Sequence, residues 1–272
     1  PLNSRSYKVR SGDTLSGAGR QSSERPTGRV CKKDGPRRGK KAEKPEGFVK
    51  SAKFRKTLMP MILKVRAGHS EKDVITSAAA IVSRGGVIAY PTETIYGLGA
   101  DATNEQAIRR IFEIKGRNFS NPISVIIGRP DDVHPLVRKF PKAAQKLMDE
   151  FWPGPLTIVF EAADGVSPLL TAKTGRIGIR LSGHDGARRI AEALGKPLTA
   201  TSANLSGSPE CATVNQVMAQ LGDRLDAIVD LGNTRGTAGS TIIDAATEQP
   251  VILRTGVISR EEIFKKTGIH IF

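Results

Sequence analysis

The chain has 272 residues, of which 38% are hydrophobic, so it can bury a sizeable core in one large domain or two small ones. Its formal net charge of +15 points to a polyanionic partner. No apolar run approaches the ~20 residues that span a bilayer, and no hydrophobic signal segment precedes the core. We therefore expect a cytoplasmic protein without membrane contact.

The positive charge is concentrated at the start of the chain. Residues 1–60 hold 17 of the 42 Lys and Arg but only 5 of the 27 Asp and Glu, whereas residues 61–272 are nearly balanced at +3. Residues 1–58 show little apolar periodicity, so we expect a disordered basic tail before one folded domain at 59–272. A nucleic-acid-binding arm is the functional alternative for this tail. Residues 7–16, YKVRSGDTLS, resemble the opening of a LysM module, but the helical continuation of such a module is missing.

From residue 61, apolar patterns predict alternating strands and helices. Strands are predicted at residues 61–65, 87–90, 122–128, 156–160, 177–181, 197–201, 227–232, 240–244 and 250–254. Helices are predicted at residues 71–84, 105–116, 141–151, 186–195, 213–222 and 259–268, with Asn104 as an N-cap. The alternation is typical of an α/β fold. Because no helix separates the last two strands, we expect a mixed parallel and antiparallel sheet.

Four polar segments follow or leave the predicted strands: PTETIYGLG, KGRNFSNP, TSANLSG and AGSTIID…RTG. Loops at strand ends are where α/β proteins place ligands. The segments supply cations, hydroxyls and amides: Lys115, Arg117, Arg254, Thr92, Thr94, Ser202, Ser206, Ser240, Thr241, Asn121 and Asn204. Such a set is suited to a ligand that carries phosphate.

Other chemistries have weaker support in the sequence. None of the four polar segments has an activating His beside its serines, and neither G-x-S-x-G nor a paired-carboxylate arrangement occurs. Neither the P-loop nor the dinucleotide-binding glycine pattern is present. The two cysteines and four scattered histidines lack disulfide or zinc spacing, so we expect no metal held by the protein itself. Taken singly, each polar segment also reads as an ordinary helix end or turn.

Seven motifs that occur in a fixed order identify a family far more specifically than any one of them alone. YPTETIYGLGADA, KGR…NPIS, WPGPLT, IGIRL, TSANLSG, STIID and LRTG resemble the YrdC-like family of threonylcarbamoyl-AMP synthases, over about four-fifths of the chain. The resemblance implies the short form with the YrdC domain alone, in which a twisted mixed sheet flanked by helices surrounds a basic cavity. It also implies a nucleotidyltransferase that joins ATP, L-threonine and bicarbonate into threonylcarbamoyl-AMP and pyrophosphate. A separate transferase complex would then modify tRNA.

The resemblance also implies roles for individual residues. Lys115 and Arg117 would be catalytic and would bind ATP. Threonine or the carbamate would contact three hydroxyls: Thr92, Thr94 and Ser240. ATP would further contact Asn121, Thr157, Ser202, Asn204 and Arg254, with Mg²⁺ bound mostly through phosphate and water. The glycines at 97 and 99 would let the backbone approach the ligand. Many relatives carry a His near residues 124–127, where this chain has SVII.

Two other functions compete with the synthase. A non-catalytic protein that binds tRNA or double-stranded RNA would use the same positive charge, but it has no need for the full set of motifs. A carbamoyl-transfer domain of hydrogenase-maturation proteins shares the expected fold, but the acylphosphatase and zinc-finger segments of those proteins do not occur upstream.

Overall fold

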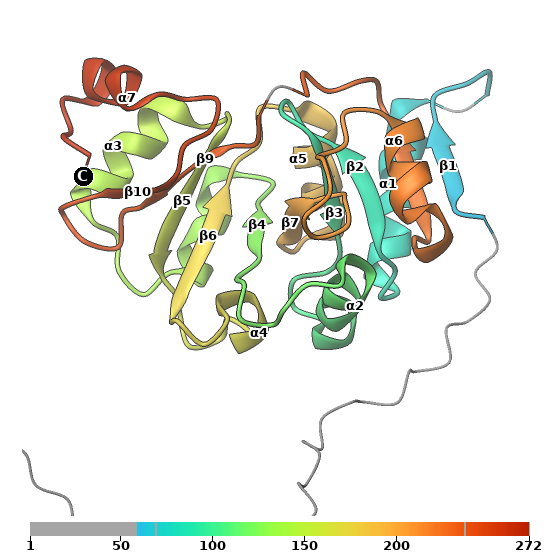
Figure 1. Ribbon diagram of the computed structural model, residues 1–272, viewed down its shortest axis with the longest axis horizontal. Coiled ribbons are helices and arrows are strands. Elements are labelled where there is room, and N and C mark those ends of the chain that lie inside the picture. Colours follow the sequence, from blue (N-terminus) through green and yellow to red (C-terminus); the bar gives the residue numbers. More distant parts are fainter. Residues whose placement is uncertain (1–58, 69, 237, 272) are drawn as a thin grey trace, which may run out of the picture. The chain divides into compact units, whose positions relative to one another are not determined.

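The computed structural model describes residues 59–68, 70–236 and 238–271, and the tail expected at residues 1–58 lies outside these ranges. Within them, ten strands form one sheet in the order β1-β8-β2-β3-β7-β4-β6-β5-β9-β10 (Figure 1). The strands are β1 Met61–Lys64, β2 Ile88–Pro91, β3 Tyr96–Gly99, β4 Ser124–Ile126, β5 Leu156–Glu161, β6 Arg176–Arg180, β7 Leu198–Ser202, β8 Ala227–Asp230, β9 Thr241–Asp244 and β10 Val251–Arg254. Parallel pairs such as β4/β6 and antiparallel pairs such as β5/β6 coexist, which confirms the predicted mixed sheet.

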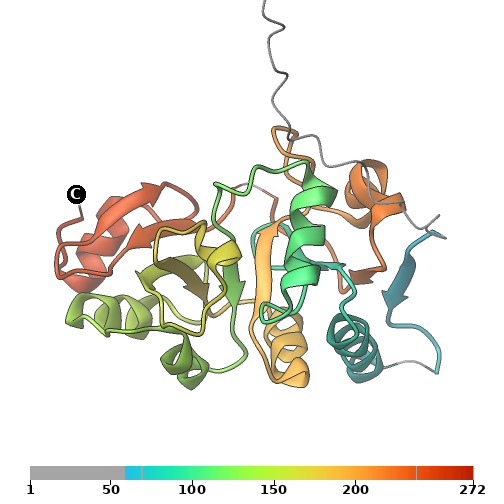
Figure 2. The same cartoon turned by 90° about the horizontal axis from the view of Figure 1, so that it is seen from below.

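Helices cover both faces of the sheet. They are α1 Glu71–Ser83, α2 Glu105–Lys115, α3 Lys142–Phe151, α4 Pro168–Thr171, α5 Asp185–Leu194, α6 Val214–Leu221 and α7 Arg260–Thr267, with short 3-10 helices at Pro130–Leu136 and Gly222–Arg224. Side chains of α1 and α5 pack with strand residues such as Ile88, Tyr90 and Ile126 in one core cluster. The larger cluster includes residues of α2 and α6, which lie on the opposite side of the sheet (Figure 2).

Local sequence signals explain the ends of α2, the helix that leads into the candidate site. The Asn104 side chain accepts hydrogen bonds from the main-chain N–H groups of Gln106 and Ala107, which confirms the predicted N-cap. Gly116 ends the helix in the left-handed region at φ 59°. A residue with a Cβ is strained in that conformation, so glycine is favoured there.

The motif YPTETIYGLG departs from the sequence prediction. It forms two antiparallel strands, β2 and β3, rather than one strand and a polar exit. The two glycines also meet a side chain of the protein itself: a Cβ on Gly99 would lie 2.9 Å from the ring of Tyr90, and one on Gly97 would lie 3.1 Å from it. The glycines therefore make room for a buried tyrosine whose hydroxyl donates to the carbonyl of Thr199.

A search of the described residues for membrane-spanning segments finds no helix with the length and apolar character needed to cross a bilayer.

Candidate active site

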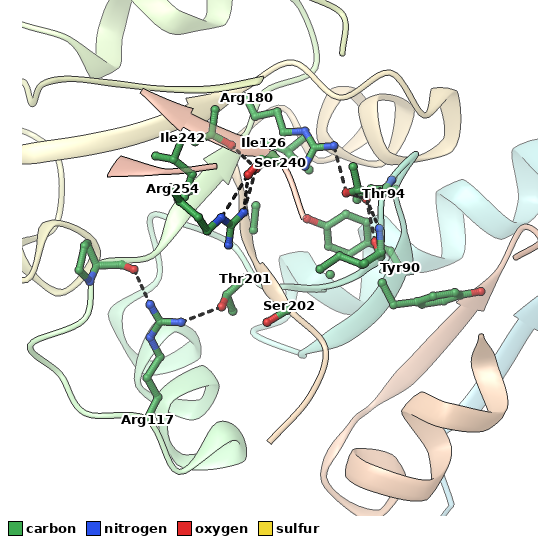
Figure 3. Close-up of a pocket in the computed structure, with 18 residues that line it drawn as sticks. Tyr90, Thr94, Arg117, Ile126, Arg180, Thr201, Ser202, Ser240, Ile242 and Arg254 are labelled. Atoms are coloured by element: carbon green, nitrogen blue, oxygen red, sulfur yellow. Dashed lines mark hydrogen bonds between the residues drawn. The ribbon is translucent and has the colours of Figure 1, made fainter. Parts of the chain in front are cut away.

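A cavity lies on the face of the sheet where the β2–β3 turn meets strands β4, β5, β6, β7, β9 and β10 (Figure 3). Its lining residues are Tyr90, Thr92, Thr94, Ile95, Tyr96, Gly97, Arg117, Pro122, Ser124, Ile126, Thr157, Arg180, Ala200, Thr201, Ser202, Ser240, Ile242 and Arg254. The set contains three arginines and seven Ser or Thr hydroxyls but no carboxylate. The residues that line this cavity therefore favour a negatively charged ligand.

The turn between β2 and β3 is built by its own hydroxyls. Thr92 Oγ1 donates to the carbonyl of Ile95 at 2.7 Å and accepts from the main-chain N–H of Thr94 and of Ile95. Thr94 Oγ1 lies 2.9 Å from Thr92 Oγ1 and accepts from Arg180 Nη2 at 3.3 Å. Thr92 thus shapes the turn, whereas Thr94 connects the turn to an arginine of the cavity.

Arg180, at the end of β6, is almost completely buried. Its Nη2 lies 2.9 Å from a carboxylate oxygen of Glu93, and its Nε donates to the carbonyl of Gly154. Burial alone would raise the pKa of the Glu93 carboxyl, but Arg180 and hydrogen bonds from Ser182 and Gly183 hold that pKa below its usual value. Nη1 of Arg180 has no partner among the described residues, so it can donate to a ligand.

On the opposite wall, Arg254 and Ser240 form a second polar group. Nη2 of Arg254 donates to the carbonyl and to Oγ of Ser240, at 2.7 and 3.2 Å. Oγ of Ser240 in turn lies 2.8 Å from Oγ1 of Thr157. These residues meet because β9 pairs in parallel with β5 and antiparallel with β10. Burial, together with the charge of Arg180, lowers the pKa of the Arg254 guanidinium.

Arg117 faces the same cavity from the loop after α2. Its Nη1 donates to Oγ1 of Thr201 at 3.0 Å, and its Nη2 donates to the carbonyl of Pro122 at 2.9 Å. Burial lowers the pKa of this guanidinium, and the positive charge of Arg254 lowers it further. Mutual repulsion among buried arginines is relieved when an anion binds between them.

Three of the ten residues expected at the site do not line the cavity. Lys115 and Asn204 are buried behind its wall and contact each other, with Lys115 Nζ 3.1 Å from Asn204 Oδ1. Burial and the charge of Arg117 lower the pKa of the Lys115 ammonium to about 8. Asn121 is exposed next to Pro122, which does line the cavity. The other seven residues come together as expected.

Sequence reasoning missed Arg180 as a member of the site. In IGIRL, alternation places Ile177 and Ile179 on one face of the sheet, and Arg180 therefore shares the opposite face with Gly178. A cation in a buried strand requires a partner or a ligand, which was the available signal. Thr201 and Ser124 were also missed, because their contribution depends on strand register rather than on a motif.

No group of three or more His, Cys, Asp or Glu suited to a metal ion occurs in the part of the chain that the structure describes. A magnesium ion that accompanies a nucleotide would be held mostly by phosphate oxygens and water.

The fold and cavity define an α/β protein with a mixed sheet and a site for an anionic ligand. The profile of the Sua5/YciO/YrdC family, described as telomere recombination, matches residues 80–256. The chain belongs to this family. It is 37% identical over 210 residues to a threonylcarbamoyl-AMP synthase of Pyrococcus abyssi and 40% identical over 199 residues to one of Bacillus subtilis, covering 77% and 72% of this chain.

Solved structures agree with this assignment. P. abyssi Sua5 complexed with L-threonine matches with a TM-score of 0.73 at 36% identity, over 79% of this chain and 63% of that one. Escherichia coli YciO matches with a TM-score of 0.68 at 26% identity, over 75% of this chain and 100% of that one. The chain spans 62% and 58% of the lengths of the Pyrococcus and Bacillus relatives.

Proposed function

We propose that this protein is an L-threonylcarbamoyladenylate synthase, a nucleotidyltransferase that makes threonylcarbamoyl-AMP and pyrophosphate from L-threonine, bicarbonate and ATP. The observation that carries the proposal is the convergence of Arg117, Arg180 and Arg254 on one cavity whose described lining has no carboxylate. A substrate pair with a triphosphate and an α-carboxylate matches that charge. Family membership and the names of the relatives support the same reaction.

The two walls of the cavity suggest a division of the substrates. Arg180 would hold the threonine carboxylate through its free Nη1, and Thr94 would lie beside it. Arg117 and Arg254 would hold the phosphates of ATP, assisted by the hydroxyls of Ser202 and Ser240. The threonine amine and bicarbonate would form the carbamate with loss of one water molecule, and the carbamate would then lie between the two groups.

In this reaction an oxygen of the carbamate attacks the α-phosphorus, a new P–O bond forms, and pyrophosphate leaves. The arginines would stabilise the negative charge of the transition state. No protein nucleophile is needed, because the substrate supplies the attacking oxygen. Mg²⁺ would neutralise the phosphates when bound with ATP. The adenylate would then pass to a separate transferase complex that acts on tRNA.

The test is pyrophosphate release with ATP, Mg²⁺ and bicarbonate, with and without L-threonine. We expect release that depends on threonine and bicarbonate, and we expect Arg254→Met to reduce kcat/KM at least about 100-fold, as loss of one buried transition-state contact does. Arg129→Met serves as the matched control, because Arg129 is largely exposed and, within the described residues, forms an ion pair with Asp132 alone. Folded protein that releases no pyrophosphate in response to threonine would contradict the proposal.

A further inference from the structure

Lys115, the last residue of α2, is surrounded by the segment that follows β7. Its Nζ lies 2.8 Å from the carbonyl oxygen of Asn204, 3.1 Å from Asn204 Oδ1 and 3.4 Å from Ser202 Oγ, and it also donates to the carbonyl of Ser202. The residue is only 3% exposed. An ammonium has three N–H donors, so these four oxygens leave none for a ligand.

Gly116 explains why two cations so close in sequence have different partners. Its left-handed conformation ends α2, and the N–H of Arg117 folds back to the carbonyl of Phe112 at 2.9 Å. After this reversal, the Arg117 guanidinium reaches Thr201 and lines the cavity. Lys115 precedes the reversal and reaches residues 202 and 204 from behind the cavity wall.

The main chain adds a second connection at the same place. The N–H of Ser206 donates to the carbonyl of Lys115 at 3.0 Å, so the segment 202–206 is tied to α2 by both the side chain and the backbone of Lys115. Ser202, the first residue of this segment, lines the cavity. The placement of that part of the wall therefore depends on Lys115.

We propose that Lys115 is a positioning residue, which holds the segment 202–206 in place from behind the cavity, and that the phosphate contact of the KGR motif is made by Arg117 alone. The identity of the reaction served by this wall rests on the proposed function. The support given to the segment is a property of the protein without substrates, and it can be tested separately.

The first experiment measures amide hydrogen exchange in the full-length, ligand-free protein. In Lys115→Met we expect exchange at residues 201–206 to be at least about tenfold faster, because the N–H groups of Ala203 and Ser206 lose the fixed geometry of their bonds to Tyr96 and Lys115. Peptides from β5 are expected to stay at the wild-type rate. Unchanged exchange at 201–206 in folded Lys115→Met would overturn the proposal, whatever the activity of the protein.

Lys196→Met is the matched control, because this lysine flanks the opposite end of β7 and pairs with Asp101 at 2.7 Å. In Lys196→Met, the rate of amide exchange at residues 201–206 should match that of the wild type. If Lys115→Met does not fold, Lys115→Gln takes its place, since the shorter amide keeps a donor but loses the charge. We expect a smaller acceleration at 201–206 in that variant, and a wild-type rate would again overturn the proposal.

The second experiment separates positioning from phosphate contact, with inorganic pyrophosphate as the probe. We expect Arg117→Met to raise the Kd for pyrophosphate at least about tenfold and Lys115→Met to raise it less than threefold, while kcat of Lys115→Met still falls at least tenfold. A rise of Kd in Lys115→Met as large as that in Arg117→Met exceeds what a displaced Ser202 hydroxyl accounts for, so it would show a phosphate contact by the ammonium and would overturn the proposal. Absence of pyrophosphate binding in the wild type would count against the proposed function instead, and the exchange experiment would still decide the role of Lys115.

Discussion

Nη2 of Arg180 and Oε1 of Glu93 lie 2.9 Å apart, and this ion pair joins the end of β6 to the turn between β2 and β3. The Glu93 carboxylate also accepts hydrogen bonds from Ser182 and from the N–H of Gly183. A single side chain thus orients a cavity arginine and fastens two loops together.

Glu93→Gln should destabilise the protein by about 2 kcal/mol at pH 7, because a buried arginine loses its counter-ion. The pKa of Glu93 is lowered by folding, so its contribution to stability is complete above the ordinary glutamate pKa of about 4.3 and is lost as pH falls through the lower folded value. The difference in free energy of unfolding between wild type and variant should therefore shrink below about pH 4. Denaturant unfolding at a series of pH values measures it, and a difference independent of pH would contradict the ion-pair assignment.

Arg180→Lys should raise KM for L-threonine about 100-fold while KM for ATP changes little, since a lysine cannot reproduce the planar fork that holds a carboxylate. Steady-state pyrophosphate release with each substrate varied in turn checks this split. Arg129 is far more exposed than Arg180, so Arg129→Met is the control and should leave both KM values unchanged. Equal effects on both KM values would place Arg180 outside the threonine site.

Gly178→Ala tests the close packing of β6 against Ser124 and Thr157, two residues that line the cavity. An added Cβ would lie 2.4 Å from Ser124 Oγ and 3.3 Å from Thr157 Cγ2, so neighbouring strands must shift, at a cost of about 1–3 kcal/mol. Thermal unfolding should show a lower Tm, and activity should fall because Ser124 and Thr157 line the cavity. Gly165→Ala should change stability by less than about 0.5 kcal/mol, because its Cβ would meet no atom within 4 Å. A wild-type Tm for Gly178→Ala would refute the close packing.

The burial of Lys115 predicts a distinctive pH dependence. Its pKa falls to about 8 on folding, so between pH 8 and about 10.4 the unfolded chain binds more protons than the native protein. Stability of the wild type relative to Lys115→Met should therefore rise over that interval, by ~3 kcal/mol in total. Paired denaturant curves from pH 7 to 10.5 provide the measurement. A relative stability that falls with pH would show that the ammonium is stabilised, not destabilised, by its surroundings.

Most elements were predictable because their signals are local. The strands at 156–160 and 177–181 and the helix with Asn104 as its cap appear within about a residue of the expected bounds. Such signals depend on neighbours a few residues apart. The strand β3 was missed because two of its four residues are glycines, which have a low propensity for strands. It forms because it pairs with β2 and β7.

The sequence by itself determined the alternation of strands and helices, the order of the polar motifs and therefore the family, since each resides in a short contiguous stretch. Only the tertiary structure decided which of those polar groups share a cavity. Arg180 enters it through the register of β6, while Lys115 is turned behind its wall by the reversal at Gly116. The physical reason is that the surroundings of a side chain depend on strand pairing, which joins residues as far apart in the chain as Leu98 and Thr201 and cannot be read from either segment alone.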